Sequence, residues 1–160
     1  MPDIIGINQS LNIVGGLKLK EAIITNPQTT VYDASVLMTE KNSDSVIVVG
    51  QTGTSSMPDA MRKPVILGIV TVKDIVNRVI AKGLDTKKTM VTQVMTSPVQ
   101  TASPDTPVYR IVLLMNQNNF RQIPVIDSDK VIGIVTSNVI NSSLLTQIID
   151  DLKVIVTIFK

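Results

Sequence analysis

The stretch Gly68-Ile-Val-Thr-Val-Lys-Asp-Ile75 decides the fold, because its apolar residues predict a buried strand that runs directly into a helix. Thr71 stands at the N-cap position, where its hydroxyl and the free amides of Val72 and Lys73 lie at the positive end of the helix dipole and favour an anion. Asp74, three residues later, is placed to accept hydrogen bonds from ribose hydroxyls. The alternative is a capping box, Thr-x-x-Asp, which only starts a helix.

A repeat covers most of the chain. Residues 27–32 are matched by residues 104–109 at an offset of 77 (104 − 27), whereas the Gly-Ile-Val-Thr of 68–71 recurs at 133–136 at an offset of 65 (133 − 68). The first copy therefore carries about 12 additional residues, which we place in the loop-like segment 51–63. We predict two copies of one unit, at 17–83 and 90–151, with terminal extensions at 1–16 and 152–160.

Within each copy, the hydrophobic periodicity predicts the order β-α-β-β-α and therefore an α/β fold. Apolar residues at helical spacing give one buried face to a helix that begins near Val31 and one to a helix that begins near Val108. A further helix, 73–82, is expected to end at Gly83. Its predicted buried face is Val72, Ile75, Val76, Val79 and Ile80. The predicted strands are 22–25, 45–49, 65–70, 99–102, 123–126 and 131–135.

Composition narrows the function. The 160-residue chain is 44% hydrophobic, carries a net charge of +2 and has no His and no Cys, so it lacks the commonest general base, metal ligand and nucleophile. It also lacks a P-loop, a dinucleotide fingerprint and paired carboxylates. We therefore expect a non-enzymatic protein without a metal site. Residues 1–16 lack the basic start and long apolar core of a signal peptide, and no apolar segment is long enough to cross a membrane, so we expect a cytoplasmic protein without membrane contact.

The tandem units, the Gly-hydrophobic-hydrophobic-Thr-x-x-Asp ending of the first copy and the Val-Met-Thr-Ser-Pro-Val of 94–99 together resemble a pair of cystathionine-beta-synthase (CBS) domains. The resemblance covers roughly residues 17–151. It implies a Bateman module, in which two tandem β-α-β-β-α units pack pseudo-symmetrically through their sheets. The clefts between the units of such a module bind AMP, ADP, ATP or S-adenosylmethionine. It also implies regulation of a partner protein that the sequence does not identify. We expect a homodimer formed by the apolar helix faces around 75–80 and 108–115.

The resemblance implies one complete nucleotide site. It assigns Thr71 to phosphate, Asp74 to ribose and Arg121 to phosphate as the best cation. For Arg121 the alternative is a solvated loop arginine. The residues implied for this main site are Thr71, Val72, Lys73, Asp74, Met95, Thr96, Pro98, Val99, Thr101, Arg121, Gln122 and Pro124.

The second cleft departs from the family pattern. Val139 stands where the ribose carboxylate belongs, and Asn138 is one position off, about 100° away around the helix. Asp44 places a carboxylate where phosphate favours a cation, and 18–22 lacks the Met-Thr-x-Pro pattern. We predict a degenerate second site made of Thr136, Asn138, Val139, Leu19, Ala22 and Asp44.

Two other classes of function remain open. The chain is either a structural dimerisation module without ligand, or an adaptor for nucleic acid that uses the basic residues Arg62, Lys63, Lys82, Lys87 and Lys88. Those residues are scattered, and an aromatic content of 2% provides no stacking platforms, so we do not expect nucleic acid as a partner. The tail 154–159 is an extra strand or a docking segment.

Overall fold

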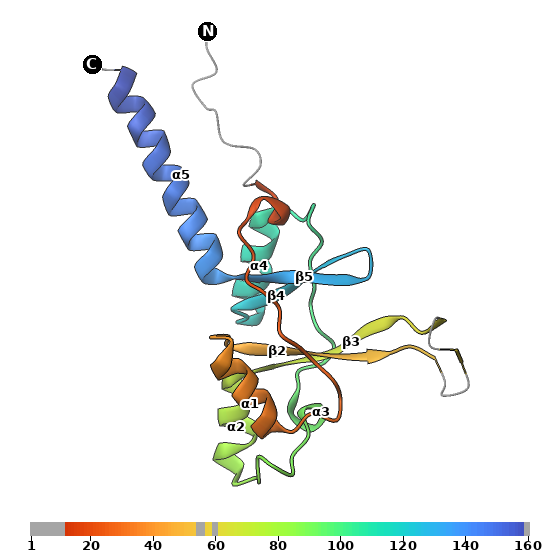
Figure 1. The fold of residues 1–160 in the computed structure, drawn as a ribbon. Coiled ribbons are helices and arrows are strands. Elements are labelled where there is room, and N and C mark those ends of the chain that lie inside the picture. Colours follow the sequence, from red (N-terminus) through yellow and green to blue (C-terminus); the bar gives the residue numbers. More distant parts are fainter. Residues whose placement is uncertain (1–11, 54–56, 59–60, 159–160) are drawn as a thin grey trace. The chain divides into compact units, whose positions relative to one another are not determined.

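The computed structural model describes residues 12–53, 57–58 and 61–158. Helices and strands are mixed along the chain (Figure 1), which confirms the predicted α/β fold. Residue contacts divide the chain into two compact units, one formed by Ala22–Gln100 and the other by Met1–Glu21 together with Thr101–Lys160. We refer to them as the central unit and the terminal unit.

The central unit is built on a three-stranded sheet in the order β1-β2-β3. β1 pairs with β2 in parallel, and β2 pairs with β3 antiparallel. The connection between β2 and β3 falls within the predicted insertion, 51–63. The elements of this unit are β1 (Ile24–Thr25), α1 (Val31–Glu40), β2 (Ser45–Gln51), β3 (Pro64–Thr71), α2 (Val72–Arg78), a 3-10 helix (Ile80–Lys82) and α3 (Val91–Val94).

Helix α1 forms where the apolar spacing predicts it. Thr30 is its N-cap, since the threonine hydroxyl accepts a hydrogen bond from the amide of Asp33 at 3.1 Å. Val31, Ala34 and Met38 lie one turn apart and are buried in the core of the central unit. The predicted buried face of this helix is confirmed.

Helix α2 differs from the prediction in length and in its buried face. Regular α-helix ends at Arg78, a 3-10 turn follows, and Gly83 closes the segment with a left-handed φ of 65°. Val79 is fully buried and Ile75 packs against the core. The predicted burial of Val72, Val76 and Ile80 is wrong, because these three side chains are exposed. The 3-10 turn changes the helical phase after Val79, so an unbroken period of 3.6 residues does not describe this segment.

The terminal unit contains a hairpin of two antiparallel strands, β4 and β5. Single bridges extend it on both sides: Ala102 pairs with Val125 in parallel, and Lys20 pairs with Ile134 antiparallel. The predicted strand 99–102 is therefore only a bridge at Ala102. The elements of this unit are a 3-10 helix (Val14–Gly16), α4 (Val108–Asn118), β4 (Gln122–Asp127), β5 (Lys130–Thr136) and α5 (Ser137–Ile158).

Helix α5 (blue in Figure 1) runs through most of the tail whose structure the sequence left open. Residues 154–158 are helical, so the alternative of an extra strand is wrong for them, and Phe159 lies outside the described residues. Within the described part of the chain, no helix combines the length and the apolar character needed to cross a membrane.

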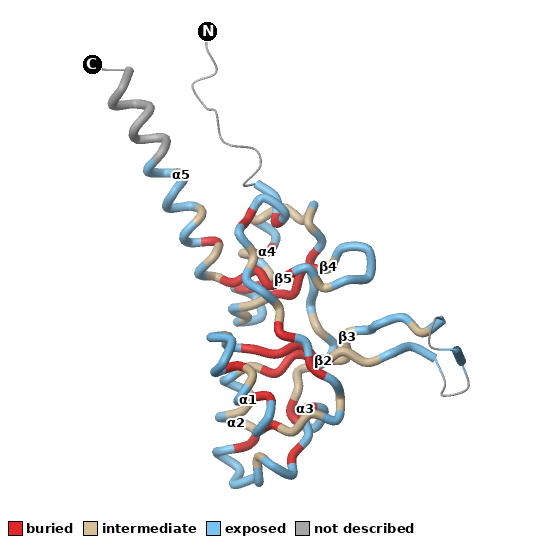
Figure 2. The backbone as a smooth tube through the Cα atoms, viewed as in Figure 1, coloured by how far each residue is buried: buried red, intermediate tan, exposed pale blue. Residues whose placement is uncertain are grey.

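Each unit has its own apolar core. Buried residues concentrate on the strands and on the helix faces that pack against them (Figure 2). In the central unit the core includes Val46, Val48 and Val70 of β2 and β3. In the terminal unit it includes Ile111 and Met115 of α4, as the spacing predicts.

The two units do not coincide with the two sequence copies. Residues 90–100, which open the second copy, pack in the central unit, and residues 12–21 pack in the terminal unit. The reason is backbone pairing: Thr96 donates to and accepts from Ile69 of β3, at 2.8 and 3.1 Å. Val14 likewise donates to the carbonyl of Thr106 at 2.9 Å and is fully buried, although the sequence placed it in a terminal extension.

Candidate functional site

The junction between β3 and α2 carries the first two predicted site residues. Thr71 is the N-cap of α2, and its hydroxyl accepts a hydrogen bond from the amide of Asp74 at 3.2 Å. The same hydroxyl donates to Asp74 Oδ2 at 2.7 Å, and the Thr71 amide donates to that oxygen at 2.9 Å. The capping box is therefore complete, as the structural alternative requires.

The other oxygen of the Asp74 carboxylate faces Arg78. Arg78 Nη2 lies 3.2 Å from Asp74 Oδ1, and the Asp74 side chain is only 12% exposed. A carboxylate offers about four acceptor positions. Thr71 fills two on Oδ2 and Arg78 fills one on Oδ1, so among the contacts of the described residues one acceptor position remains for a ligand.

Arg78 also holds the segment that follows α3. Its Nη1 donates to the carbonyl of Val94 at 2.6 Å, and its Nη2 donates to Thr96 Oγ1 at 3.1 Å. Thus one guanidinium connects the Asp74 carboxylate to a segment of the predicted adenine wall. Arg78 is not among the site residues predicted from the sequence, although its position four residues after Asp74 on a helix was a usable signal.

The remaining wall residues continue this segment. Met95 lies against Gly68 of β3, where any larger residue would collide with the Met95 side chain. The glycine of the motif therefore permits the close approach of the 94–96 segment. Pro98 is exposed and follows a cis peptide bond, and Val99 is half-buried.

The start of α2 offers fewer phosphate donors than the sequence suggested. The Val72 amide donates to the carbonyl of Asp44 at 3.0 Å, and the hydroxyl proton of Thr71 is directed to Asp74. Lys73 is exposed in the first turn of α2 and is a cation at this end of the helix. The phosphate-binding role of Thr71 stays a prediction, and its hydrogen bonds are those of a cap.

The other four residues of the predicted main site belong to the terminal unit. Thr101 is exposed, Gln122 is half-buried at the start of β4, and Pro124 is buried within β4. Arg121 is exposed, and its carbonyl accepts a hydrogen bond from the Ser137 amide at 3.1 Å, at the start of α5. Its predicted contact with phosphate stays a prediction.

The second motif keeps the cap and lacks the carboxylate. Thr136 Oγ1 accepts a hydrogen bond from the Val139 amide at 3.2 Å, and Val139 packs against the core of the terminal unit. Asn138 is exposed. Of the other residues predicted for this degenerate site, Leu19 also packs against that core, whereas Ala22 and Asp44 belong to the central unit.

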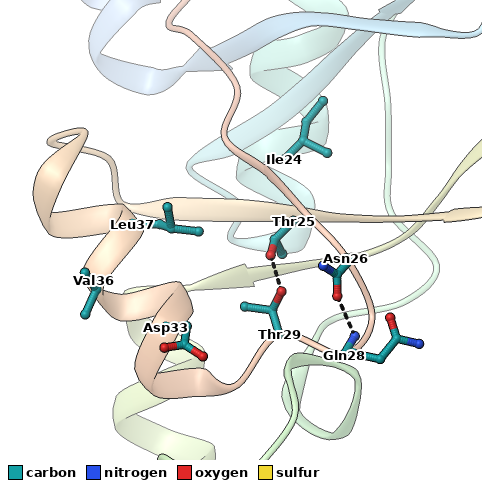
Figure 3. A pocket seen from close by; sticks show the side chains of 8 residues that line it. All are labelled: Ile24, Thr25, Asn26, Gln28, Thr29, Asp33, Val36 and Leu37. Atoms are coloured by element: carbon teal, nitrogen blue, oxygen red, sulfur yellow. Dashed lines mark hydrogen bonds between the residues drawn. The ribbon is translucent and has the colours of Figure 1, made fainter.

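One pocket of the central unit lies away from these residues. A pocket of about 800 Å³ is bordered by β1, the turn that follows it and α1 (Figure 3). Several of its polar groups pair with one another: Thr25 Oγ1 lies 2.5 Å from Thr29 Oγ1, and the backbone amide of Gln28 donates to Asn26 Oδ1 at 2.9 Å. None of the predicted site residues lines it.

A smaller pocket of about 340 Å³ in the terminal unit involves one predicted residue, Arg121. It lies between the end of α4 and the first turns of α5, where Ser137 and Asn141 contribute polar atoms. The described residues contain no group of acidic side chains that could hold a metal ion, and the sequence contains no His or Cys.

Comparison with known proteins adds a family assignment. The sequence model of the CBS domain matches residues 14–81 and 91–142. CBS domain-containing protein CBSX3, mitochondrial, of Arabidopsis thaliana is 35% identical over 109 residues, which are 67% of this chain and 48% of that protein. CBS domain-containing protein CBSCBSPB2 of the same plant is 34% identical over 118 residues, 74% of this chain and 20% of that protein. This chain therefore spans less than half the length of these relatives.

Two solved structures resemble this one over most of the chain. The CBS domain pair of protein MJ0100, in complex with methylthioadenosine and S-adenosyl-L-methionine, has a TM-score of 0.66 at 26% identity and covers 82% of this chain and 98% of that chain. A conserved protein from Pyrococcus horikoshii has a TM-score of 0.65 at 25% identity and covers 88% of this chain and 92% of that chain.

Proposed function

The chain belongs to the CBS domain family, and from this premise we propose that it is a regulatory module that binds AMP, ADP or ATP through Asp74 and its neighbours. Regulatory binding is the general role of CBS domain pairs. To this general role we add three proposals: the identity of the nucleotide, the residues that bind it and the absence of catalysis. The chain has no His or Cys, and the described residues contain no group of acidic side chains that could hold a metal ion, which supports a role without catalysis.

The observation that carries the proposal is the state of Asp74. Its carboxylate is 12% exposed, fixed by Thr71 and Arg78, and retains one acceptor position on Oδ1. A fixed, partly desolvated carboxylate favours a hydroxyl donor, because the hydrogen bond is charge-assisted and little side-chain entropy is lost on binding. The count of acceptors supports one strong hydrogen bond to a ribose hydroxyl.

The adenosine part is supported by the neighbouring segment and by a relative. Met95 and Thr96 adjoin Asp74 through Arg78, so apolar and polar groups for a base lie beside the group for ribose. The MJ0100 domain pair was solved with methylthioadenosine and S-adenosyl-L-methionine, and both compounds contain adenosine. We place the phosphates near the exposed cation Lys73, since the donors at the start of α2 are largely used within the protein.

A titration series tests the proposal. Calorimetry with adenosine, AMP, ADP, ATP and S-adenosylmethionine on the purified chain is expected to show binding of an adenosine nucleotide, and saturation at 100 times Kd raises the free energy of unfolding by about 2.7 kcal/mol. The 2′-deoxy and 3′-deoxy forms of the best ligand then test Asp74. One of them should bind the wild type weakly, while Asp74→Asn should bind that form and its parent more equally. No heat and no thermal shift with any compound would overturn the proposal.

A second candidate, a structural dimerisation module without ligand, is favoured by one observation. The capping box of Thr71 and Asp74 is complete, so both residues have a structural task without any nucleotide. The exposed apolar residues Val76 and Ile80 in the central unit and Leu113 on α4 offer faces for a homodimer. The two candidates predict different effects of Asp74→Ala. The substitution lowers only the stability of the protein if Asp74 serves only as a cap, and it also lowers the affinity for nucleotide if Asp74 binds ribose.

A further inference from the structure

Arg78 has an arrangement that a helix terminus alone does not explain. A cation in the last turn of α2 favours the helix dipole, and an ion pair with Asp74 four residues earlier is common on helices. Arg78 goes further, because the same guanidinium also binds the Val94 carbonyl and the Thr96 hydroxyl. Val94 and Thr96 lie 16 and 18 residues away in the chain.

The 94–96 segment is consequently fixed from two sides. Its backbone pairs with β3 through the two hydrogen bonds between Thr96 and Ile69. Its other attachment is Arg78 on α2, the helix that also carries Asp74. The pairing with Ile69 holds the segment against the edge of β3, and Arg78 holds it close to the Asp74 carboxylate.

The second sequence copy offers an internal comparison. At the offset of 65 residues, Asp74 corresponds to Val139 and Arg78 corresponds to Ser143 (78 + 65). The copy that lacks the carboxylate thus lacks the guanidinium as well. The pair occurs as a unit in the copy where we place the ligand and is absent from the other, whereas the capping hydroxyls of Thr71 and Thr136 are present in both.

We propose that Arg78 is a positioning residue that locks the ribose acceptor Asp74 and the base-binding segment at Val94–Thr96 into one adenosine-reading element. This inference rests on the proposed function. The three atoms that Arg78 contacts are a carboxylate oxygen, a carbonyl oxygen and a hydroxyl oxygen of the protein, so three of its five N–H donors are used within the protein. Through these contacts Arg78 acts on the nucleoside part of the ligand rather than on its phosphates.

A positioning role of Arg78 predicts a specific pattern in the affinities for adenosine, AMP and ATP. Loss of the guanidinium should weaken adenosine, AMP and ATP by the same factor, about twofold to thirtyfold, the range for residues that act through others. A direct phosphate contact would give a loss that grows from adenosine to ATP. A simple need for positive charge beside Asp74 would be met by lysine, whereas the fork of an arginine, with its fixed planar donors, would not be replaced.

The experiment compares Arg78→Met and Arg78→Lys with Arg110→Met, which removes the same charge from an exposed position on α4. For each Arg78 variant, calorimetry should show the same loss of affinity with adenosine, AMP and ATP. The loss should be smaller for Arg78→Lys than for Arg78→Met but clearly resolved, and Arg110→Met should show no change. The double variant Arg78→Met with Thr96→Val should lose less affinity than the product of the two single losses, because each substitution removes the same hydrogen bond between Arg78 and Thr96. In the ligand-free protein, amide hydrogen exchange of residues 95–97 should rise in Arg78→Met and remain unchanged in Arg110→Met.

The outcomes separate this inference from the proposed function. Binding of nucleotide by wild type with unchanged affinities in Arg78→Met overturns the role of Arg78 alone. Wild-type affinity in Arg78→Lys, or a loss that grows with phosphate number, also overturns it. An absence of binding by wild type to all three ligands overturns both proposals.

Discussion

The hydroxyl and the amide of Thr71 both donate to one oxygen of Asp74, Oδ2, at 2.7 and 2.9 Å. Oδ2 is thus used in the cap of α2. The second oxygen, Oδ1, lies 3.2 Å from Arg78 Nη2, and of its two acceptor positions one remains for another donor. The same carboxylate can therefore cap a helix and contact a ligand. The capping and binding interpretations of Thr-x-x-Asp are compatible, and they predict effects on different measurements.

Asp74→Ala is expected to weaken adenosine-nucleotide binding about tenfold to a hundredfold, since a charge-assisted hydrogen bond to ribose contributes roughly 1.5–3 kcal/mol. The loss of the cap should lower the free energy of unfolding by roughly 0.5–2 kcal/mol. Calorimetry measures the first effect and chemical denaturation the second. Unchanged affinity together with a large loss of stability would instead favour the purely structural role.

Asp33→Ala is the matched control for this variant. Thr30 Oγ1 donates to Asp33 Oδ2 at 2.7 Å and accepts from the Asp33 amide at 3.1 Å, so α1 begins with a similar contact between threonine and aspartate. Both alanine variants should lose stability, Asp74→Ala more, because Asp74 also accepts from the Thr71 amide and pairs with Arg78. Only Asp74→Ala should lose affinity for nucleotide.

Incubation with ATP, ADP or AMP is expected to return each nucleotide unchanged. The sequence has no His and no Cys, and the described residues contain no group of acidic side chains that could bind a catalytic metal. Chromatography of the mixture after prolonged incubation is a sufficient measurement. Conversion that follows the protein through a second purification would sink the non-enzymatic assignment.

Val139→Asp is expected to restore part of the second site, because Val139 occupies the ribose-carboxylate position of the second motif. The cost is lost packing, since Val139 contacts the core of the terminal unit, and the helix dipole offsets about 0.3–1 kcal/mol of it. Combining it with Asp44→Arg is the stronger test. Titration calorimetry should move from about one site per chain toward two, if the two sites are independent.

Asn138→Asp is the control for that change. It adds the same charge one position earlier on an exposed residue, about 100° away around α5. It should leave the stoichiometry at about one. Two equivalent nucleotides per chain in the wild type would show that Val139 is not a disabling substitution.

The exposed apolar residues of α2 and α4 are expected to lie in a homodimer interface. Val76 is 50% exposed, Ile80 is 59% exposed and Leu113 is 52% exposed, and burial of such side chains on association is favourable. Val76→Glu and Leu113→Glu should shift the mass measured by light scattering toward the monomer. Met61→Glu, at a residue that is 67% exposed in the β2–β3 connection, should not. A monomeric wild type would contradict this prediction.

Much of the local structure could be predicted from the sequence because it depends on neighbours along the chain. The spacing of Val31, Ala34 and Met38 predicts the buried face of α1, and the apolar runs predict β2 to β5. The repeat predicts the same hairpin twice, and both hairpins have a register shift at the equivalent place, after Val48 and after Val125. The Thr-x-x-Asp pattern predicts the start of α2 with its capping box.

Other features depended on groups that are distant in the sequence. The segment around Thr96 packs in the central unit because its backbone pairs with Ile69, and no local pattern encodes that partner. The predicted strand 99–102 shrank to one bridge because only Ala102 finds a partner, at Val125. Val72, Val76 and Ile80 have the period of a buried face, yet all three are exposed, because only Ile75 and Val79 of this segment find packing partners in the core.

For the site, the sequence by itself determined which residue types are present: a capping threonine, a carboxylate three residues later in the first copy and a valine in the second. Only the tertiary structure decided which of their atoms are already used. Thr71 directs its proton to Asp74, and Arg78 connects Asp74 to Thr96 across 18 residues of chain. The physical reason is that hydrogen-bond partners are set by distances of about 3 Å in space, whereas the sequence specifies only the order of the groups.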